Sequence, residues 1–335
     1  MRKGILVAGN WIIDQVKVID VYPKEEALAN ILEEYTTNGG CAYNVTKALK
    51  RLGFAAPITA VGMVGDDENG NNILKDCLQM GVEVVNISTT NLKPTSYTNV
   101  MTVKSTGMRT FFHNRGANAL LNNSHFQFES KSKIFHLGYL LLLDELDSPE
   151  RDGQTHASKL LKQAQEKGFL TSVDLVSEDS ERFRDVVNPS LPYINYLFMN
   201  EFELSRLTGM PTQTNGKTSL NKCISATKKV FENGFEGLLI VHFKEGAVAI
   251  DKDNSVFFQT AIKIEATKIG STVGAGDAFA AGVLFGIHEN WSVQKSLELG
   301  VATAFSSLQH VSPSEGIQSY TACLDIAKLY NYNLD

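Results

Sequence analysis

Short apolar runs of strand length recur along the chain and are separated by segments of helix length. The runs lie around residues 5–8, 57–61, 133–137, 170–174, 195–199 and 237–241. The pattern predicts helices over residues 43–52, 69–80, 219–233, 277–287, 293–308 and 318–329. Strands that alternate with helices in this way build a parallel sheet covered by helices. The sequence therefore predicts an α/β fold.

Two segments depart from this alternation. Residues 12–37 and 95–113 contain β-rich, partly alternating pieces that fit no strand–helix unit. We expect them to form a small sheet that projects from the main body and is a candidate lid. A surface hairpin without a function is the alternative, because such excursions also occur for no catalytic reason.

The composition is that of a globular protein with a sizeable core. The chain has 335 residues, of which 43% are hydrophobic and 20% charged, enough for one large α/β domain or two smaller ones. Its formal net charge of -6, without a long basic block, disfavours binding to nucleic acid or to an anionic membrane. An anionic substrate therefore needs a local site.

The cysteines and the first residues bear on the cellular compartment. Cys41, Cys77, Cys223 and Cys323 form no CxxC pair, which argues against a zinc site or a disulfide framework and indicates reduced thiols. The first apolar run is too short for a signal peptide, and no stretch approaches a membrane span. We expect a cytoplasmic protein.

Residues 271–279 are the most informative stretch, since they join a glycine-rich turn to an apolar helix with Asp277 at the junction. The amides of a helix's first turn lack intrahelical partners, and the helix dipole adds positive charge there. Gly274, Ala275 and Gly276 can therefore cradle a phosphoryl group, beside which Asp277 can accept a proton. The alternative is a turn and a helix cap without chemistry.

A second glycine pair, Gly39 and Gly40, precedes another predicted helix, with Asn44 in its first turn. The amide of Asn44 offers a donor and an acceptor to ligand hydroxyls, and glycines allow close approach. Asp14 follows the first strand, at the edge where open α/β sheets gather ligands. Each residue also has an ordinary reading, as a helix start or a turn former.

Asn200 and Glu203 follow another predicted strand and lie three residues apart, on one face of a helix. Oxygen ligands suit Mg²⁺, which keeps several waters and shares its shell with nucleotide phosphates. The same pair fits a capping box, with Asn200 as the cap and Glu203 reaching back. The sequence leaves both interpretations open.

Together these motifs resemble those of the ribokinase-like (PfkB) family of carbohydrate and nucleoside kinases. The resemblance runs from about Gly9 to Gly316 and is carried by the stretches 39–53 and 272–277. It implies a three-layer sandwich with a mainly parallel central sheet and a small β-sheet lid, in a single domain over 1–335. It also implies ATP-dependent phosphorylation of a hydroxymethyl group, with the sugar between the main sheet and the lid.

The resemblance also implies roles for particular residues. The sugar-binding set corresponds to Asp14, Gly39, Gly40 and Asn44. The family's NxxE motif for magnesium and phosphate corresponds to Asn200 and Glu203, with Glu203 acting on Mg²⁺ through water. The anion hole corresponds to Gly274, Ala275 and Gly276, and the general base to Asp277. The remaining ATP contacts implied are Lys244, Gly246 and Thr272, in addition to Asn200 and Gly276.

Three positions depart from the family's pattern. Ser271 stands where an Asp tied to a monovalent cation is common, which leaves potassium activation open. Phe243 stands where the nucleotide-site turn usually has glycine. Gly138 lies near the position of a substrate-binding carboxylate in some sugar kinases, which weakens an assignment to ribose itself.

Our prediction is a kinase of a small sugar that uses ATP and Mg²⁺. Arg109 and Arg115 near the predicted lid can grip a carboxylate, which makes a sugar acid credible, although exposed arginines without that role are common. A nucleoside needs an aromatic wall, for which Tyr43 and Phe112 are candidates. A catalytically silent regulator that binds sugar or nucleotide is a further alternative, against which the retained base argues. Apolar lid strands predict a homodimer.

Overall fold

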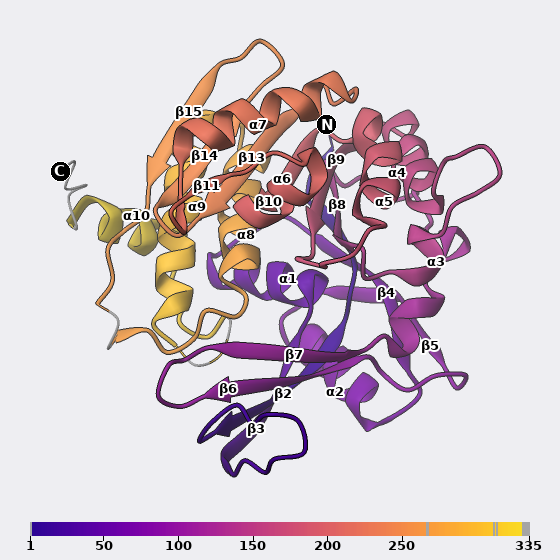
Figure 1. Ribbon diagram of the computed structural model, residues 1–335. Helices are drawn as coiled ribbons and strands as arrows, with labels where there is room; N and C mark the ends of the chain where they lie inside the picture. The colour runs from indigo at the N-terminus through magenta and orange to yellow at the C-terminus, as the bar shows by residue number, and fades with distance from the viewer. Residues whose placement is uncertain (1, 266–267, 311, 313, 330–335) are drawn as a thin grey trace.

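The computed structural model describes residues 2–265, 268–310, 312 and 314–329. Within them a nine-stranded sheet has the order β15-β14-β13-β10-β9-β8-β1-β4-β5 (Figure 1). Its strands are β1 (Ile5–Gly9), β4 (Ile58–Gly65), β5 (Glu83–Thr90), β8 (Ile134–Leu140), β9 (Leu170–Leu175), β10 (Tyr196–Asn200), β13 (Leu238–Phe243), β14 (Gly246–Ile250) and β15 (Val256–Thr260). Neighbours from β13 to β5 are parallel, whereas β14 and β15 pair antiparallel at one edge.

Both faces of this sheet are covered. On β1, Ile5 and Val7 pack into one apolar cluster with α1, α2, α8, α9 and α10, while Leu6 and Ala8 pack into another with α3 to α7. The helices are α1 (Cys41–Arg51), α2 (Glu68–Gln79), α3 (Asp144–Asp147), α4 (His156–Glu166), α5 (Phe183–Val187), α6 (Glu201–Thr208), α7 (Leu220–Glu232), α8 (Ala275–His288), α9 (Val293–Leu308) and α10 (Tyr320–Leu329). Strands buried on both faces read as continuous apolar runs, and the predicted three-layer sandwich is confirmed.

A separate four-stranded sheet lies along the lower side of the view in Figure 1. Its strands, in the order β3-β2-β6-β7, are β2 (Ile12–Ile19), β3 (Ile31–Gly39), β6 (Tyr97–Val103) and β7 (Arg109–Asn114). The central pair, β2 and β6, is parallel, and the outer pairs are antiparallel. The prediction that the two irregular segments form a small sheet is confirmed.

The apolar pattern located the inner strands well and missed several outer elements. The missed β5 is an edge strand whose residues alternate between exposed and partly buried, so it has no continuous apolar run. Also missed were β14, β15 and the amphipathic α4. A two-stranded ribbon, β11 (Gln213–Thr214) with β12 (Lys217–Thr218), adds a minor feature. None of the described helices has the length and apolarity needed to cross a membrane.

The carboxyl ends of the parallel strands position the candidate site. Gly9 at the end of β1 pairs with Gly62 on one side and Gly138 on the other. A Cβ on Gly9 would lie 1.8 Å from the carbonyl oxygen of Gly138, so these strand ends approach as only glycine allows. Polar residues follow on neighbouring strands at the same edge, namely Asn10, Tyr139, Asp174 and Asn200.

Candidate active site

Asp277 lies in the first turn of α8, directly after the glycine turn. Gly274 is the N-cap residue in a left-handed conformation, φ 74°, which suits glycine. The Ala278 amide donates to the carbonyl oxygen of Gly274 at 2.8 Å, and the amides before it belong to the turn that has no intrahelical acceptors. Gly274, Ala275 and Gly276 therefore form the turn that the sequence predicted.

The carboxylate of Asp277 points into the protein, where it accepts hydrogen bonds from three side chains. The Asn44 Nδ2 group donates to Oδ2 at 2.8 Å. The Tyr139 hydroxyl lies 2.7 Å from Oδ1 and 2.8 Å from Oδ2, and the Cys41 thiol is the third donor. Burial raises the pKa of Asp277, while these donors oppose the rise because they stabilise the charged form.

Asn44 supplies a second feature of the site. Its amide nitrogen is used by Asp277, but its Oδ1 atom is buried and has no hydrogen-bond partner among the described residues. A buried polar atom without a partner costs about 1–3 kcal/mol. A ligand hydroxyl that donates to Oδ1 would remove this cost, and the sugar-binding role of Asn44 stays a prediction.

Asp14 on β2 lies close to the two glycines before α1. A Cβ on Gly39 would come 2.1 Å from the Asp14 Oδ2 atom, and one on Gly40 would come 2.5 Å from the Asn10 carbonyl oxygen. The sequence predicted that these glycines permit close approach of a ligand. The structure shows close approach of protein groups, which brings Asp14 against the start of α1, and the approach of a ligand stays a prediction.

Several carboxylates gather around this point, and their charges repel one another. Burial, and then the charge of Asp277, raises the pKa of Asp14 to about 7. Burial, Asp277 and Glu203 raise the pKa of Asp174 well above its usual range. The ligand atoms of Cys41, Asp174 and Asp277 all lie within 4.8 Å of one another. The arrangement concentrates negative charge beside the helix N-terminus.

Asn200 and Glu203 form the capping box at the start of α6. The Asn200 side chain accepts from the Glu203 amide at 2.9 Å, and the Glu203 carboxylate accepts from the Asn200 amide at 2.8 Å. Ser177 also donates to Glu203, at 2.7 Å. Burial raises the pKa of Glu203 to about 7. The structural interpretation of this pair is confirmed, and its magnesium role stays a prediction.

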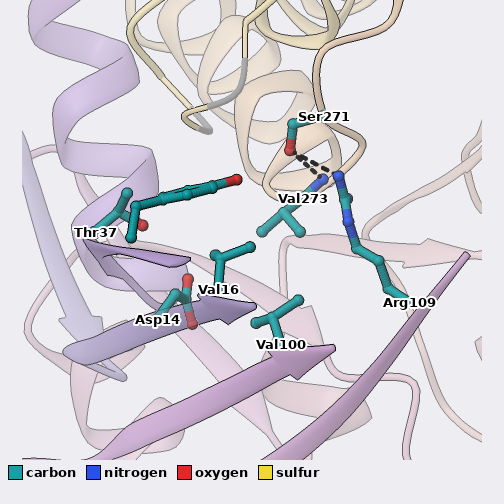
Figure 2. A pocket seen from close by; sticks show the side chains of 8 residues that line it. Asp14, Val16, Thr37, Val100, Arg109, Ser271 and Val273 are labelled. Carbon is teal, nitrogen blue, oxygen red and sulfur yellow. Dashed lines mark hydrogen bonds between the residues drawn. The ribbon is translucent and has the colours of Figure 1, made fainter. Parts of the chain in front are cut away.

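Arg109 connects the small sheet to the loop before α8. Its Nη1 group donates to the Thr272 hydroxyl at 2.8 Å and its Nη2 group to the Ser271 hydroxyl at 3.2 Å. The loop and β2 face each other across a small cavity of about 10 Å³, which Asp14 and Arg109 line (Figure 2). The guanidinium therefore lies at the meeting point of the two predicted parts of the site.

Arg115 does not share this position. It is ion-paired with Glu178 at 3.0 Å and with Asp144 at 3.2 Å, and it donates to the Leu141 carbonyl oxygen at 2.8 Å. These partners hold the guanidinium in a structural network. Our suggestion that Arg115 grips a substrate carboxylate is therefore wrong, because its charge is already neutralised within the protein.

The predicted nucleotide residues are more dispersed. Lys244 is exposed in the turn between β13 and β14. Gly246 lies against β15, where a Cβ would come 2.4 Å from the Gln259 carbonyl oxygen, so strand packing alone requires glycine. The ring of Phe243 stacks on Phe258 at 6.4 Å between centroids. The larger residue in place of the family's glycine is thus accommodated by packing against the neighbouring strand.

Sequence reasoning missed Tyr139, Cys41 and Asp174. Asp174 is the residue before the last of the buried strand β9, and the argument that selected Asp14 after the first strand would have found it. Tyr139 and Cys41 give no such signal, since neither forms part of a polar motif in the sequence. Only the packing of β8 and α1 against α8 shows that both are donors to Asp277.

Comparison with known proteins decides the family. The model of the family described as "pfkB family carbohydrate kinase" matches residues 8–319. This chain belongs to the pfkB family. Ribokinase of Arabidopsis thaliana is 26% identical to this pfkB kinase over 307 residues, which cover 91% of this chain and 76% of that protein. Ketohexokinase of Mus musculus is 23% identical over 308 residues, covering 90% and 95%.

Solved structures show the same fold. Arabidopsis thaliana ribokinase complexed with ribose and ATP superimposes on this pfkB kinase with a TM-score of 0.77 at 23% identity, over 98% of this chain and 99% of that one. The central sheet and the separate small sheet thus belong to the fold of its structural neighbours. By family and relatives the protein is a carbohydrate kinase.

The raised pKa of Asp14 predicts a pH-dependent penalty in the stability of this pfkB kinase. An acid that binds its proton more tightly when folded adds stability below its unfolded pKa of 3.8, and this stability is lost as the pH rises through about 7. Asp14→Asn removes the buried charge. We expect the variant to be more stable than the wild type by on the order of 2 kcal/mol at about pH 8, and the difference to shrink toward about pH 4.

Urea unfolding across this pH range measures the effect. An Asp14→Asn variant that is less stable than the wild type at the alkaline end, or a difference independent of pH, would contradict the assignment of a strained buried carboxylate at position 14.

Proposed function

We propose that this protein transfers the γ-phosphoryl group of ATP to a hydroxymethyl group of a small sugar or sugar derivative. The observation that carries the proposal is the buried carboxylate of Asp277 in the first turn of α8, with the unpartnered Asn44 amide oxygen beside the same carboxylate. A base, an acceptor for a substrate hydroxyl and a helix N-terminus for the phosphoryl group thus lie together.

Asp277 is the general base in this proposal. It accepts the proton of the substrate hydroxyl while the hydroxyl oxygen forms a bond to the γ-phosphorus and the bond from that phosphorus to the bridging oxygen breaks. The amides of Gly274 to Gly276 form the anion hole, where they offset negative charge on the transferring group. A carboxylate with an only moderately raised pKa suffices, since the proton can transfer late in a loose transition state.

The acceptor is held, in our proposal, by Asp14, Gly39, Gly40, Asn44 and Arg109. Asp14 accepts from sugar hydroxyls, and Asn44 accepts through its free Oδ1 atom. The glycines allow the sugar to lie against the backbone before α1. The small sheet acts as the lid of a single domain over 1–335, and the bonds from Arg109 to the loop before α8 support this role.

ATP lies, in our proposal, against Asn200, Lys244, Gly246, Thr272 and Gly276. Asp174 and Glu203 would hold Mg²⁺, the latter through water. The residues fit a divalent cation, because both carboxylates are buried, the charge of Glu203 raises the pKa of Asp174, and a cation would stabilise the ionised forms of both. When bound, the metal supplies charge neutralisation at the phosphates.

The Ser271 hydroxyl oxygen already accepts hydrogen bonds from Arg109 and from the Val273 amide. It therefore has fewer free lone pairs for a monovalent cation than an Asp carboxylate would have.

The two aromatic candidates for a nucleoside wall, Tyr43 and Phe112, do not line the small cavity beside Asp14. Tyr43 is buried and donates its hydroxyl to Asp76, and Phe112 is half exposed on β7. The aromatic residue that does line this cavity, together with Asp14, is Tyr35. Arg109 bonds to hydroxyls and lies beside the small cavity, so an anionic sugar derivative stays within the proposal.

An ADP-release assay with a panel of neutral sugars, sugar acids and nucleosides tests the function. We expect saturable turnover with a sugar or sugar acid and none with nucleosides. Turnover only with nucleosides would replace the sugar assignment. Saturable binding of a sugar without turnover would favour the silent regulator instead.

The small sheet also carries exposed apolar side chains. Ile31, Leu32, Met108, Phe111 and Phe112 are all exposed by 46% or more. Exposed apolar strands tend to be covered by a partner, and we propose a cytoplasmic homodimer that joins through this sheet. Light scattering that gives the mass of one chain at assay concentration would refute the dimer.

A further inference from the structure

Most of the hydrogen-bonding capacity of the Asp277 carboxylate is already used within the protein. An ionised carboxylate has about four lone-pair positions. The Tyr139 hydroxyl faces both oxygens, at 2.7 and 2.8 Å, and so lies across the open side of the group. Asn44 and Cys41 supply the other donors. A substrate hydroxyl that approaches Asp277 from the side of Tyr139 can therefore reach the carboxylate only after the Tyr139 hydroxyl has moved.

Tyr139 is the donor best placed to move. Asn44 and Cys41 lie on the packed helix α1 and are 4% and 0% exposed. The Cys41 sulfur also contacts His136 Nε2 at 3.4 Å, and the Nδ1 atom of the same ring lies 2.9 Å from the Ser172 hydroxyl oxygen. Tyr139 is only partly buried and lies near the end of β8 rather than on a helix, so it is less tightly enclosed than the other two donors.

We propose that the Tyr139 hydroxyl is a placeholder for the substrate hydroxyl at Asp277, which the substrate must displace before transfer can occur. The inference rests on the proposed role of Asp277 as the base. An O–H donor that lies within hydrogen-bond distance of both carboxylate oxygens reproduces the contact that an attacking hydroxyl has to make.

The placeholder has a chemical consequence for water. Hydrolysis of ATP is the same transfer with water as acceptor, in which the water oxygen bonds to the γ-phosphorus, the bond to the bridging oxygen breaks and the proton passes to the base. Tyr139 keeps water from this contact, and the cavity of about 10 Å³ that Asp14 and Arg109 line has room for about one water molecule at most. A sugar displaces Tyr139 because Asp14, Asn44 and Arg109 give it additional contacts that water cannot make at once.

Tyr139→Phe tests the inference, since it keeps the ring and removes the hydroxyl. With ATP, Mg²⁺ and no acceptor, we expect hydrolysis about five-fold faster than in the wild type, the worth of one net hydrogen bond. The KM of the acceptor, with D-fructose tried first and any other sugar that the panel identifies next, should fall by a similar factor. Loss of a donor raises the pKa of Asp277, so the hydrolysis rate and the KM are both measured at about pH 8 to keep the carboxylate ionised.

Tyr196→Phe is the matched control. Tyr196 is partly buried in the same apolar cluster as Tyr139, but it is not one of the three donors to Asp277, so its variant should match the wild type. Hydrolysis no faster in Tyr139→Phe, or a lower kcat with unchanged KM, would overturn the inference and make Tyr139 a group that only orients the base. Absence of sugar turnover in the wild type would instead refute the proposed function.

Discussion

Asp277→Asn should lower kcat by about a thousand-fold, because an amide cannot accept the proton of the attacking hydroxyl. The side chain keeps its size, and its Oδ1 atom still accepts a hydrogen bond. We therefore expect the affinity for the acceptor, measured by calorimetry, to change little. The coupled ADP-release assay measures kcat, and the loss should appear at saturating acceptor and ATP.

Asp147→Asn is the control for this substitution. Asp147 is also a buried acid whose pKa burial raises to about 7, but its carboxylate accepts hydrogen bonds from the amides of Leu141 and Leu143 and lies near the charges of Arg182 and Arg115. This variant should keep its kcat, with any effect confined to stability. An Asp277→Asn enzyme that is as active as the Asp147→Asn enzyme would remove the base assignment.

Asn44→Leu should lower kcat/KM by about a hundred-fold. The substitution removes the donor to Asp277, a hydrogen bond to a charged group worth about 1.5–3 kcal/mol, and it also removes the free Oδ1 acceptor that we assign to the sugar. Loss of the donor raises the pKa of Asp277, so the acid limb of the pH profile should move to higher pH. Steady-state kinetics at several pH values measure both effects.

Thr46→Val offers a matched control on the same helix. The Thr46 hydroxyl is buried and, like the Asn44 oxygen, has no hydrogen-bond partner among the described residues. Valine has nearly the same shape, so this variant removes an unpartnered polar atom that does not touch Asp277. We expect unchanged kinetics and equal or higher stability. Equal losses in both variants would mean that α1 packing, rather than the Asn44 amide, supports activity.

The parts of the site formed by neighbouring residues could be predicted from the sequence. The turn from Gly274 to Asp277 and the capping box of Asn200 and Glu203 are local, because a glycine turn or a cap depends on residues three or four positions apart. The inner strands followed from their continuous apolar runs. The edge strand β5 did not, since one of its sides stays exposed.

Roles that depend on distant partners could not be predicted in this way. Arg109 and Arg115 are the same residue type and lie near the same predicted lid. The structure nevertheless pairs Arg115 with Glu178, whereas Arg109 donates hydrogen bonds to Ser271 and Thr272. Which of two such side chains finds a carboxylate depends on how β7 and the segment that follows it lie against the rest of the chain. The pattern along the chain carries no signal of that choice.

The sequence by itself determined the α/β class, the small sheet, the family resemblance and the glycine turn that leads into α8. The tertiary structure alone decided what surrounds Asp277. Asn44 lies 233 residues away in the chain and Tyr139 lies 138 away, and both donate to the same carboxylate. Local propensity acts over a few residues, whereas burial and the electrostatic environment of a carboxylate are set by every element that packs around it.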